Sequence, residues 1–288
     1  FYQLKKGILY IILLLFLSGC ETNLNYEIHG YTQKIIVEGM ISNGQYPAVY
    51  LSLNVPVWQQ VDSATILNNV IRTAKVTVSD GTKTEILTSS WDKTHFPPYV
   101  YKGTSIKGEE GKTYYLTVEY SGYTLHATTT LPRSTAIESI KALPVEGEDS
   151  LRQMQVTFTI DPALKNSYRV YTKKPNDGFY TETPVLFNAE FSLSGIKTFT
   201  VSPMPKLTDP SYDEGTKFRR GDTVFVKLCT IDSVSTQFFK ELTFFSSSTG
   251  VGNIYFVGEK TGLPSNISTP GFGIWYGNAF KTYRYVVE

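Results

Sequence analysis

The chain has 288 residues, of which 14% are aromatic, and its 27 Lys and Arg nearly balance its 26 Asp and Glu. This near-neutral balance gives the chain no overall electrostatic footprint for a nucleic acid and no basic tail for anionic lipid. Tyr and Phe suit half-buried pleated surfaces, so the aromatic content favours β structure.

The first residues have the layout of a secretory signal that ends in a lipobox. Lys5 and Lys6 form a basic start, and an apolar run follows that is too short to span a bilayer. Leu17-Ser18-Gly19-Cys20 then supplies the small residues of a cleavage site. We expect residues 1–19 to be a signal peptide and Cys20 to carry acyl chains, palmitate among them, that anchor the mature chain in a membrane. An ordinary cleaved signal with a chance cysteine and a single-pass anchor are the alternatives.

Residues 20–33 are predicted to form a lipidated stalk, with a first edge strand as the alternative. Glu21 follows the cysteine directly, as in the surface-export signals of Bacteroidota-type lipoproteins, so we expect an outer-membrane protein that faces the cell exterior. If Cys20 is acylated, Cys229 has no partner for an intramolecular disulfide. Its strand-like surroundings predict a small buried residue.

Alternating apolar and polar residues predict a series of short strands between residues 34 and 132. The segment 49–55 alternates most clearly, and Asp80-Gly81 predicts a two-residue type I′ hairpin turn. Ser121-Gly122 marks another turn. Residues 56–72 lack a clear period and are either a functional loop or a short helix. Short strands with turn signals and no convincing helix predict an immunoglobulin-like sandwich over residues 34–132.

The second half, residues 133–288, is also predicted to be a β-sandwich, with one inserted helix. A strand with one apolar face covers residues 154–160. Asp232 or Ser233 is suited to cap a helix. Four apolar residues follow at near-helical spacing: Val234, Phe238, Leu242 and Phe245. The fold class is therefore all-β, with two β-sandwich domains after the signal and stalk.

The chain closes on a glycine-rich stretch. We expect two strands here, residues 272–276 and 281–287, joined by a corner that needs small residues. No internal repeat of 20 to 50 residues is visible, so a solenoid or propeller is not expected.

Three stretches resemble the Bacteroidota-type outer-membrane lipoprotein family known as domain of unknown function 4249. They are Ile36-Val37-Glu38-Gly39-Met40-Ile41, Lys112-Thr113-Tyr114-Tyr115-Leu116-Thr117-Val118, and Pro264-Ser265-Asn266-Ile267 with Gly271-Phe272-Gly273-Ile274-Trp275-Tyr276-Gly277. Together they span nearly all of the mature chain. Members of that family are typically encoded beside TonB-dependent outer-membrane transporters. The resemblance therefore implies an accessory role in nutrient uptake, and it supplies no catalytic residues.

Four aromatic residues are predicted to lie between strands, where rigid sandwiches commonly carry function. They are Trp58, Trp91, Phe96 and Tyr99. Exposed rings of this kind stack on sugars or fill a partner's pockets, which makes an independent glycan- or peptide-binding surface module the alternative function. The other possibility is that the four rings fold back as lids over the sandwich ends.

Catalytic and metal-binding motifs were not found. His29, His95 and His126 are far apart and match no zinc spacing, and no GxSxG elbow or phosphate-binding glycine loop occurs. The acidic loop with Asp209 and Asp213 fits no EF-hand pattern and leaves a calcium ion there an open question. We therefore expect no enzymatic activity, no cofactor, no nucleic acid and no assigned metal ligand.

Overall fold

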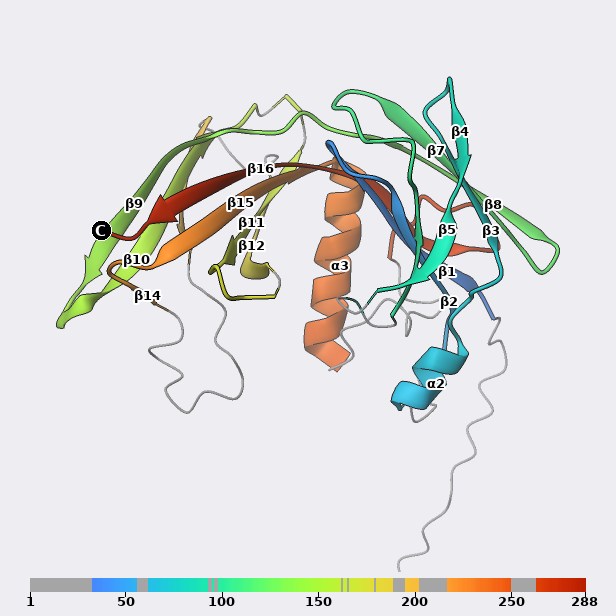
Figure 1. Cartoon of the computed structure of the whole chain (residues 1–288), viewed down its shortest axis with the longest axis horizontal. Coiled ribbons are helices and arrows are strands. Elements are labelled where there is room, and N and C mark those ends of the chain that lie inside the picture. Colours follow the sequence, from blue (N-terminus) through green and yellow to red (C-terminus); the bar gives the residue numbers. More distant parts are fainter. Residues whose placement is uncertain are drawn as a thin grey trace, which may run out of the picture. The chain divides into compact units, whose positions relative to one another are not determined.

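The structure is a computed structural model, and it describes residues 33–55, 62–92, 95, 98–161, 163–164, 166–178, 180–188, 195–201, 217–249 and 263–288 (Figure 1). These residues belong to one compact unit, Thr32–Glu288. The predicted signal peptide, Cys20 and nearly all of the predicted stalk lie outside the described residues.

The largest sheet has eight strands in the order β12-β11-β15-β16-β1-β2-β6-β5. Their bounds are Thr181–Asn188, Ser167–Lys173, Thr223–Ile231, Phe272–Val286, Ile35–Ser42, Ala48–Leu53, Tyr99–Lys102 and Thr88–Trp91. Strand β16 joins the two halves of this sheet. Its first half pairs in parallel with β1, and its second half pairs antiparallel with β15.

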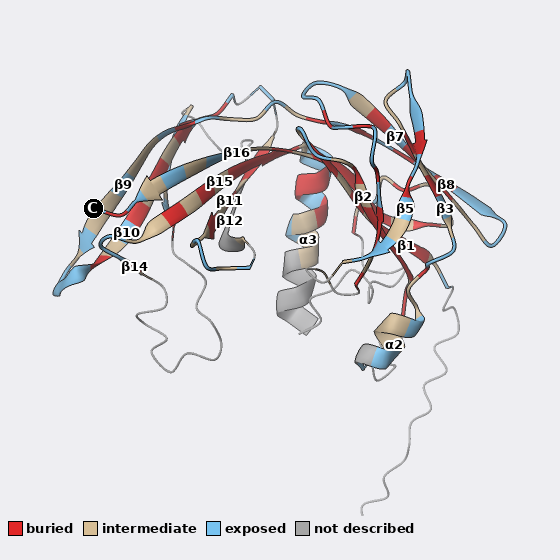
Figure 2. Ribbon diagram, viewed as in Figure 1, coloured by how far each residue is buried: buried red, intermediate tan, exposed pale blue. Residues whose placement is uncertain are grey.

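A four-stranded sheet, in the order β4-β3-β7-β8, shares a core with one end of the large sheet. Its strands are Thr84–Ile86, Lys75–Ser79, Thr113–Tyr120 and Tyr123–Thr130. Val37, Val49 and Leu51 enter this core from the large sheet, and Val78 and Leu116 enter it from the small one. The buried residues follow the strands, whereas the turn between β7 and β8 is exposed (Figure 2).

A third sheet shares a second core with the other end of the large sheet. It contains β13, β10, β14 and β9, which are Ile196–Val201, Glu148–Thr159, Phe218–Arg219 and Ile137–Val145. The predicted alternation over residues 154–160 is confirmed, because Met154, Val156 and Phe158 are fully buried here. Tyr168 and Val226 face them from the large sheet.

The all-β sandwich prediction is therefore confirmed. Two cores correspond broadly to the two predicted modules, but the large sheet continues through both of them. Trp275, from the end of the chain, belongs to the first core. Whether residues 34–132 and 133–288 are separate domains stays a prediction.

Helix α3, Ser233–Thr249, packs on the face of the large sheet opposite the sandwich cores. Alternation along β1 explains this: Ile35 and Val37 face the first core, whereas Ile36 faces the helix. Asp232 caps the helix, as predicted, because its Oδ1 accepts a hydrogen bond from the Ser235 N–H at 2.7 Å.

The predicted apolar face of this helix is only partly right. Phe238 is buried and Leu242 is half-buried against the sheet, but Val234 is 47% exposed. Phe239 packs there as well, beside Phe238. The side chain of Phe245 is not among those that the structure describes. The helix therefore uses the 238–239 pair, and Val234 lies on its solvent side.

One turn prediction is wrong, whereas the turn predicted at Ser121-Gly122 is confirmed. Asp80 does not have the positive φ that a type I′ turn requires, whereas Gly81 does, with φ of 86°. The type I′ pattern occurs at Ser121 and Gly122, with φ of 49° and 83°. The Asp80 carboxylate accepts hydrogen bonds from the backbone of residues 82 and 83, which favours a different turn.

The predicted closing corner is also wrong. Residues 272–286 form one continuous strand, β16, and Gly277 lies inside it. A Cβ at Gly277 would come within 2.7 Å of the Cα of Leu131. The small residue is therefore required by the close approach of another segment, and no chain reversal occurs there.

Among the described residues, no strand pairs with the first half of β16 on the side away from β1, and side chains supply hydrogen-bond partners there. The N–H groups of Gly273, Trp275 and Gly277 point to the side on which β15 lies farther along the strand. The Gly273 N–H donates to Ser265 Oγ at 3.1 Å, and the Trp275 N–H donates to Asn266 Oδ1 at 2.9 Å. The Gly277 N–H donates to Thr129 Oγ1 at 3.0 Å. These bonds satisfy backbone groups that would otherwise be buried without partners.

Residues 56–72 contain a short helix, α2 (Ser63–Asn68), capped by Asp62. This agrees with one of the two alternatives expected for the segment. Residues 56–61, which include Trp58, are outside the described part.

Candidate functional site

Two of the four predicted aromatic residues form a pair at the edge of the large sheet. Trp91 ends β5, the edge strand, and it lies opposite Tyr99, the first residue of β6. Their ring centroids are 4.9 Å apart in an edge-to-face arrangement at 82°. Both residues are thus in paired strands, and the prediction that they lie between strands is wrong for them. Trp91 is 56% exposed, so its indole is available to a ligand.

A cation completes this aromatic pair. The guanidinium of Arg72 lies 4.4 Å from the centre of the Tyr99 ring, and its Nη2 donates to the carbonyl of Leu67 at 3.3 Å. The end of α2 therefore holds Arg72 over the ring. The exposed indole of Trp91 offers an apolar ring with the Tyr99 phenol and the Arg72 guanidinium near it, which is suited to stacking on a sugar or a side chain.

Of the four predicted aromatic residues, the structure describes only Trp91 and Tyr99. Trp58 and Phe96 lie outside the described residues. The described part of the candidate site therefore consists of Trp91, Tyr99 and Arg72, which we call the aromatic edge.

Four polar residues meet close to the aromatic edge, and we call them the Glu38 cluster: Glu38, Tyr50, Asp92 and His95. Tyr50 lies opposite Glu38 in the β1–β2 pair. Its hydroxyl donates to Asp92 Oδ2 at 3.0 Å, and its ring stacks on His95 at 3.7 Å. His95 Nε2 lies 3.9 Å from Glu38 Oε2.

The surroundings shift the pKa values of two members of this cluster. Burial raises the pKa of Glu38, and the positive charges of His95 and Arg169 oppose that effect without cancelling it. Burial also raises the pKa of Tyr50, and the Asp92 carboxylate adds to this through charge and hydrogen bonding. The Tyr50 hydroxyl therefore keeps its proton, and Glu38 holds one more firmly than an exposed glutamate does. The cluster can donate and accept hydrogen bonds to a polar ligand.

Sequence reasoning missed Glu38. It was treated only as part of a strand, although it is the one acid within the otherwise apolar run of residues 35–42. A carboxylate in the middle of a buried strand is costly unless it has partners, so its position was the available signal. Its partners, Tyr50 and His95, were not predictable because they come from other strands and loops.

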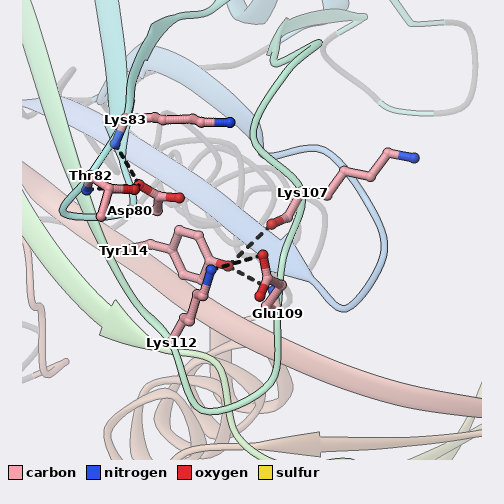
Figure 3. A network of polar contacts seen from close by, with 7 residues as sticks. All are labelled: Asp80, Thr82, Lys83, Lys107, Glu109, Lys112 and Tyr114. Atoms are coloured by element: carbon pink, nitrogen blue, oxygen red, sulfur yellow. Dashed lines mark hydrogen bonds and ion pairs between the residues drawn. The ribbon is translucent and has the colours of Figure 1, made fainter.

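A separate network of polar contacts lies in the turn that follows β3 and in the loop that precedes β7 (Figure 3). The Lys83 backbone N–H donates to Asp80 at 2.7 Å and, with other local bonds, lowers the pKa of Asp80 to about 2. The Tyr114 hydroxyl accepts from the Glu109 N–H at 2.7 Å, and Lys112 pairs with the Glu109 carboxylate at 2.8 Å. These contacts hold loops in place and leave no group directed toward a ligand.

No described helix combines the length and apolar character needed to cross a bilayer. Across the described ranges, no group of three or more His, Cys, Asp and Glu is placed to hold a metal ion. Asp209 and Asp213 lie outside those ranges, as does Cys20. Cys229 is buried, as expected.

Comparisons with known proteins give one informative match. No curated protein matches the chain. Two matching solved chains come from structures described as "Cytokine receptor complex", in crystal forms 1A and 2. The first is 8% identical, covers 87% of this chain and 96% of its own, and has a TM-score of 0.26. The second is 12% identical, covers 69% and 92%, and has a TM-score of 0.24; scores this low carry no argument about fold or function.

A family model described as "Domain of unknown function (DUF4249)" matches residues 21–284. The match covers almost the entire region that follows Cys20. The chain therefore belongs to the DUF4249 family.

Proposed function

We propose that the chain is a non-catalytic lipoprotein, anchored through Cys20 in the outer membrane and facing the cell exterior, that serves a TonB-dependent transporter in nutrient uptake. The lipobox Leu17-Ser18-Gly19-Cys20 carries this proposal, because the region matched by the family model begins at the next residue. Two or three acyl chains hold a protein to a bilayer almost permanently, since each buried methylene contributes about 0.8 kcal/mol. The transporter role is supported by the typical gene neighbourhood of the family.

The anchor is tested by exchanging each cysteine in turn. Cys20→Ala is expected to move the protein from the membrane pellet to the soluble fraction and to remove the acyl mass from the mature terminus. Cys229→Ala changes the buried cysteine of β15 and is expected to stay in the pellet. If Cys20→Ala sediments like the native chain, the anchor is wrong.

The transporter role needs its own experiment. The native chain and an unrelated lipoprotein with the same anchor are captured from membranes in mild detergent, and the associated proteins are identified by mass spectrometry. We expect a TonB-dependent transporter with this chain and not with the control. Equal recovery with both, or recovery with neither, contradicts the transporter role and leaves the anchor result untouched.

We also propose a second function, an independent glycan- or peptide-binding surface module. The observation that favours it is the aromatic edge, where Trp91 is 56% exposed and packs edge-to-face on Tyr99. Trp91→Ala is expected to abolish the retention of the protein on affinity gels that contain a glycan bound by the native chain. The melting temperature of the variant should hardly change. Tyr123→Ala is a matched control, because Tyr123 is 52% exposed on β8, in another sheet. An equal loss of melting temperature in Trp91→Ala would assign Trp91 to packing.

A further inference from the structure

Basic and aromatic side chains alternate on one face of β11, β15 and β16, and we call this set the cationic strip. Its cations are Arg169, Lys173 and Lys227, and its rings are Tyr171, Tyr180, Phe280 and Phe239. This is the face that α3 covers farther along the sheet, and Phe239 belongs to that helix. The strands lie side by side in Figure 1.

Strand pairing places these residues on a common face. Tyr171 lies opposite Lys227, and Arg169 lies opposite Cys229, which in turn pairs with Phe280. Same-face residues of a strand are about 6–7 Å apart, so Arg169 and Lys173 are separated by about 13 Å along β11. Lys227 lies between them at the level of Tyr171. The three cations therefore lie at neighbouring positions of two adjacent strands, Arg169 and Lys173 on β11 and Lys227 on β15.

Lys227 is surrounded by rings. Its Nζ lies 4.3 Å from the centre of Tyr180, 4.9 Å from Tyr171 and 5.4 Å from Phe280. Burial lowers the pKa of Lys227; Cys229 opposes this effect and the nearby Arg169 charge adds to it. The rings attract the ammonium group, but they do not neutralise its charge.

Two cations of the strip, Lys173 and Lys227, have no ion pair within the described part of the chain. The charge of the third cation, Arg169, acts on Glu38. Three other lysines do pair with acids: Lys75 with Glu119 at 2.7 Å, Lys112 with Glu109 at 2.8 Å, and Lys174 with Asp222 at 2.7 Å.

We propose that the cationic strip binds an acidic polysaccharide, a chain of sugar rings that bear carboxylate or sulfate groups. Three neighbouring cations match the repeated anionic groups of such a chain, and the interleaved rings offer apolar surface to the sugars between those groups. An acidic peptide would satisfy the cations, but it would make less use of the rings. The near-neutral chain as a whole carries no general attraction for polyanions, so the recognition is local to this face. This site is distinct from the aromatic edge and does not depend on the lipid anchor or the transporter.

The test measures equilibrium binding of the full chain in detergent to two polymer pairs. Polygalacturonate is compared with its methyl ester, and dextran sulfate with dextran. We expect binding of at least one acidic form, weakened by salt, and no binding of its uncharged counterpart. Lys227→Met keeps the apolar stem and removes the charge, so binding is expected to fall at least about tenfold, as for one lost charge-assisted contact. Lys141→Met, at an exposed lysine of β9, should bind like the native chain.

Lys227→Met should also unfold at the same temperature as the native chain or higher, because it removes a half-buried charge. Lys173→Met tests the strip at a second position and is expected to weaken binding in the same way. The proposal is overturned if neither acidic polymer binds, or if the uncharged polymers bind as well as the acidic ones. Binding of poly-glutamate, an acidic peptide, that equals the binding of the acidic polysaccharides would overturn it too. It is also overturned if Lys227→Met and Lys173→Met bind like the native chain, or if Lys141→Met loses as much as they do.

Discussion

Gly39 lies directly opposite Trp275 in the parallel pair of β1 and β16, and the indole occupies the space where a side chain at Gly39 would be. The Trp275 Nε1 donates to the backbone carbonyl of Tyr114 at 3.2 Å, and its backbone bonds to the Asn266 amide. The three stretches that carry the family resemblance are far apart in sequence, and they meet at this one side chain. Packing around Trp275 therefore brings the three stretches together in the fold.

Gly39→Ala is expected to destabilise the protein by about 1–3 kcal/mol, the usual cost of overfilling a packed core. A Cβ at this position would come within 2.7 Å of Trp275 Cε3, and the indole cannot retreat because it is fully buried. Chemical denaturation of the variant and the native chain measures the difference. Gly178→Ala is the control, because a Cβ there meets nothing within 4 Å. Equal stability of Gly39→Ala and the native chain would show that the sheet pair yields easily.

Asn266→Asp is expected to destabilise the protein more than Asn266→Ala does. The Asn266 Nδ2 donates to the carbonyls of Trp275 at 2.7 Å and Thr128 at 3.2 Å, while its Oδ1 accepts from the Trp275 N–H. Alanine removes all three bonds, with an expected loss of about 1–3 kcal/mol. Aspartate also places a negative oxygen against two carbonyl oxygens.

Denaturant midpoints rank these two variants, with Asn68→Ala on the exposed end of α2 as a control. An aspartate variant as stable as the native chain would mean that another group can pair with the edge of β16.

Glu85→Gln is expected to remove an acid-sensitive part of the stability. Both Glu85 carboxylate oxygens accept backbone N–H groups of the loop after β6: Oε1 accepts from Thr104 and Ser105, and Oε2 from Ile106. Burial alone would raise the pKa of Glu85, but these hydrogen bonds outweigh it and lower the pKa from its ordinary 4.5.

Because the pKa is lower in the folded chain, this contribution is complete above pH 4.5 and is lost as the pH falls through the folded value. Thermal melting between pH 3 and 7 measures it. The native chain should lose more stability on acidification than Glu85→Gln does, and parallel curves would contradict the assignment.

Local patterns predicted the strands and failed for contacts between distant segments. The alternation of Met154, Val156 and Phe158 predicted a strand with one buried face, because side-chain direction in a strand depends only on position. The parallel pairing of Ile36 with Phe272 joins residues more than 230 positions apart, and no local period contains it. The large sheet continues through both cores because of that pairing. Sequence reasoning therefore predicted two modules, but it did not predict that β16 joins them in one sheet.

In the candidate site, too, local sequence identified residues but did not predict the contacts between distant segments. Trp91 and Tyr99 were predicted as aromatic candidates by residue type, but their pairing required the register of β5 with β6. Lys227 belongs to a strand that was predicted correctly, and its aromatic neighbours come from β11, β16 and residue 180. Residue type therefore identifies candidates, whereas the sheet register decides which of them meet.

Glu38→Gln is expected to change the pH dependence in the opposite sense to Glu85→Gln. Burial raises the pKa of Glu38 above 4.5 despite the opposing charges of His95 and Arg169. The folded chain therefore holds this proton more tightly than the unfolded chain does. The associated stability is complete below pH 4.5 and is lost as the pH rises through the folded value. Glutamine resembles the protonated form, so Glu38→Gln should lack this decline and should be more stable than the native chain at neutral pH.

Denaturant titrations at a series of pH values from 4 to 8 check the Glu38 prediction, with the exposed Glu110→Gln as a matched control. The control should follow the native curve throughout. If Glu38→Gln follows it as well, the carboxyl is ionised at no cost in the folded chain. If the variant is instead less stable at neutral pH, the charge of Glu38 stabilises the fold through His95 and Arg169. Either result would remove the Glu38 cluster as a proton-holding site, because the raised pKa is what distinguishes it from an ordinary ion pair.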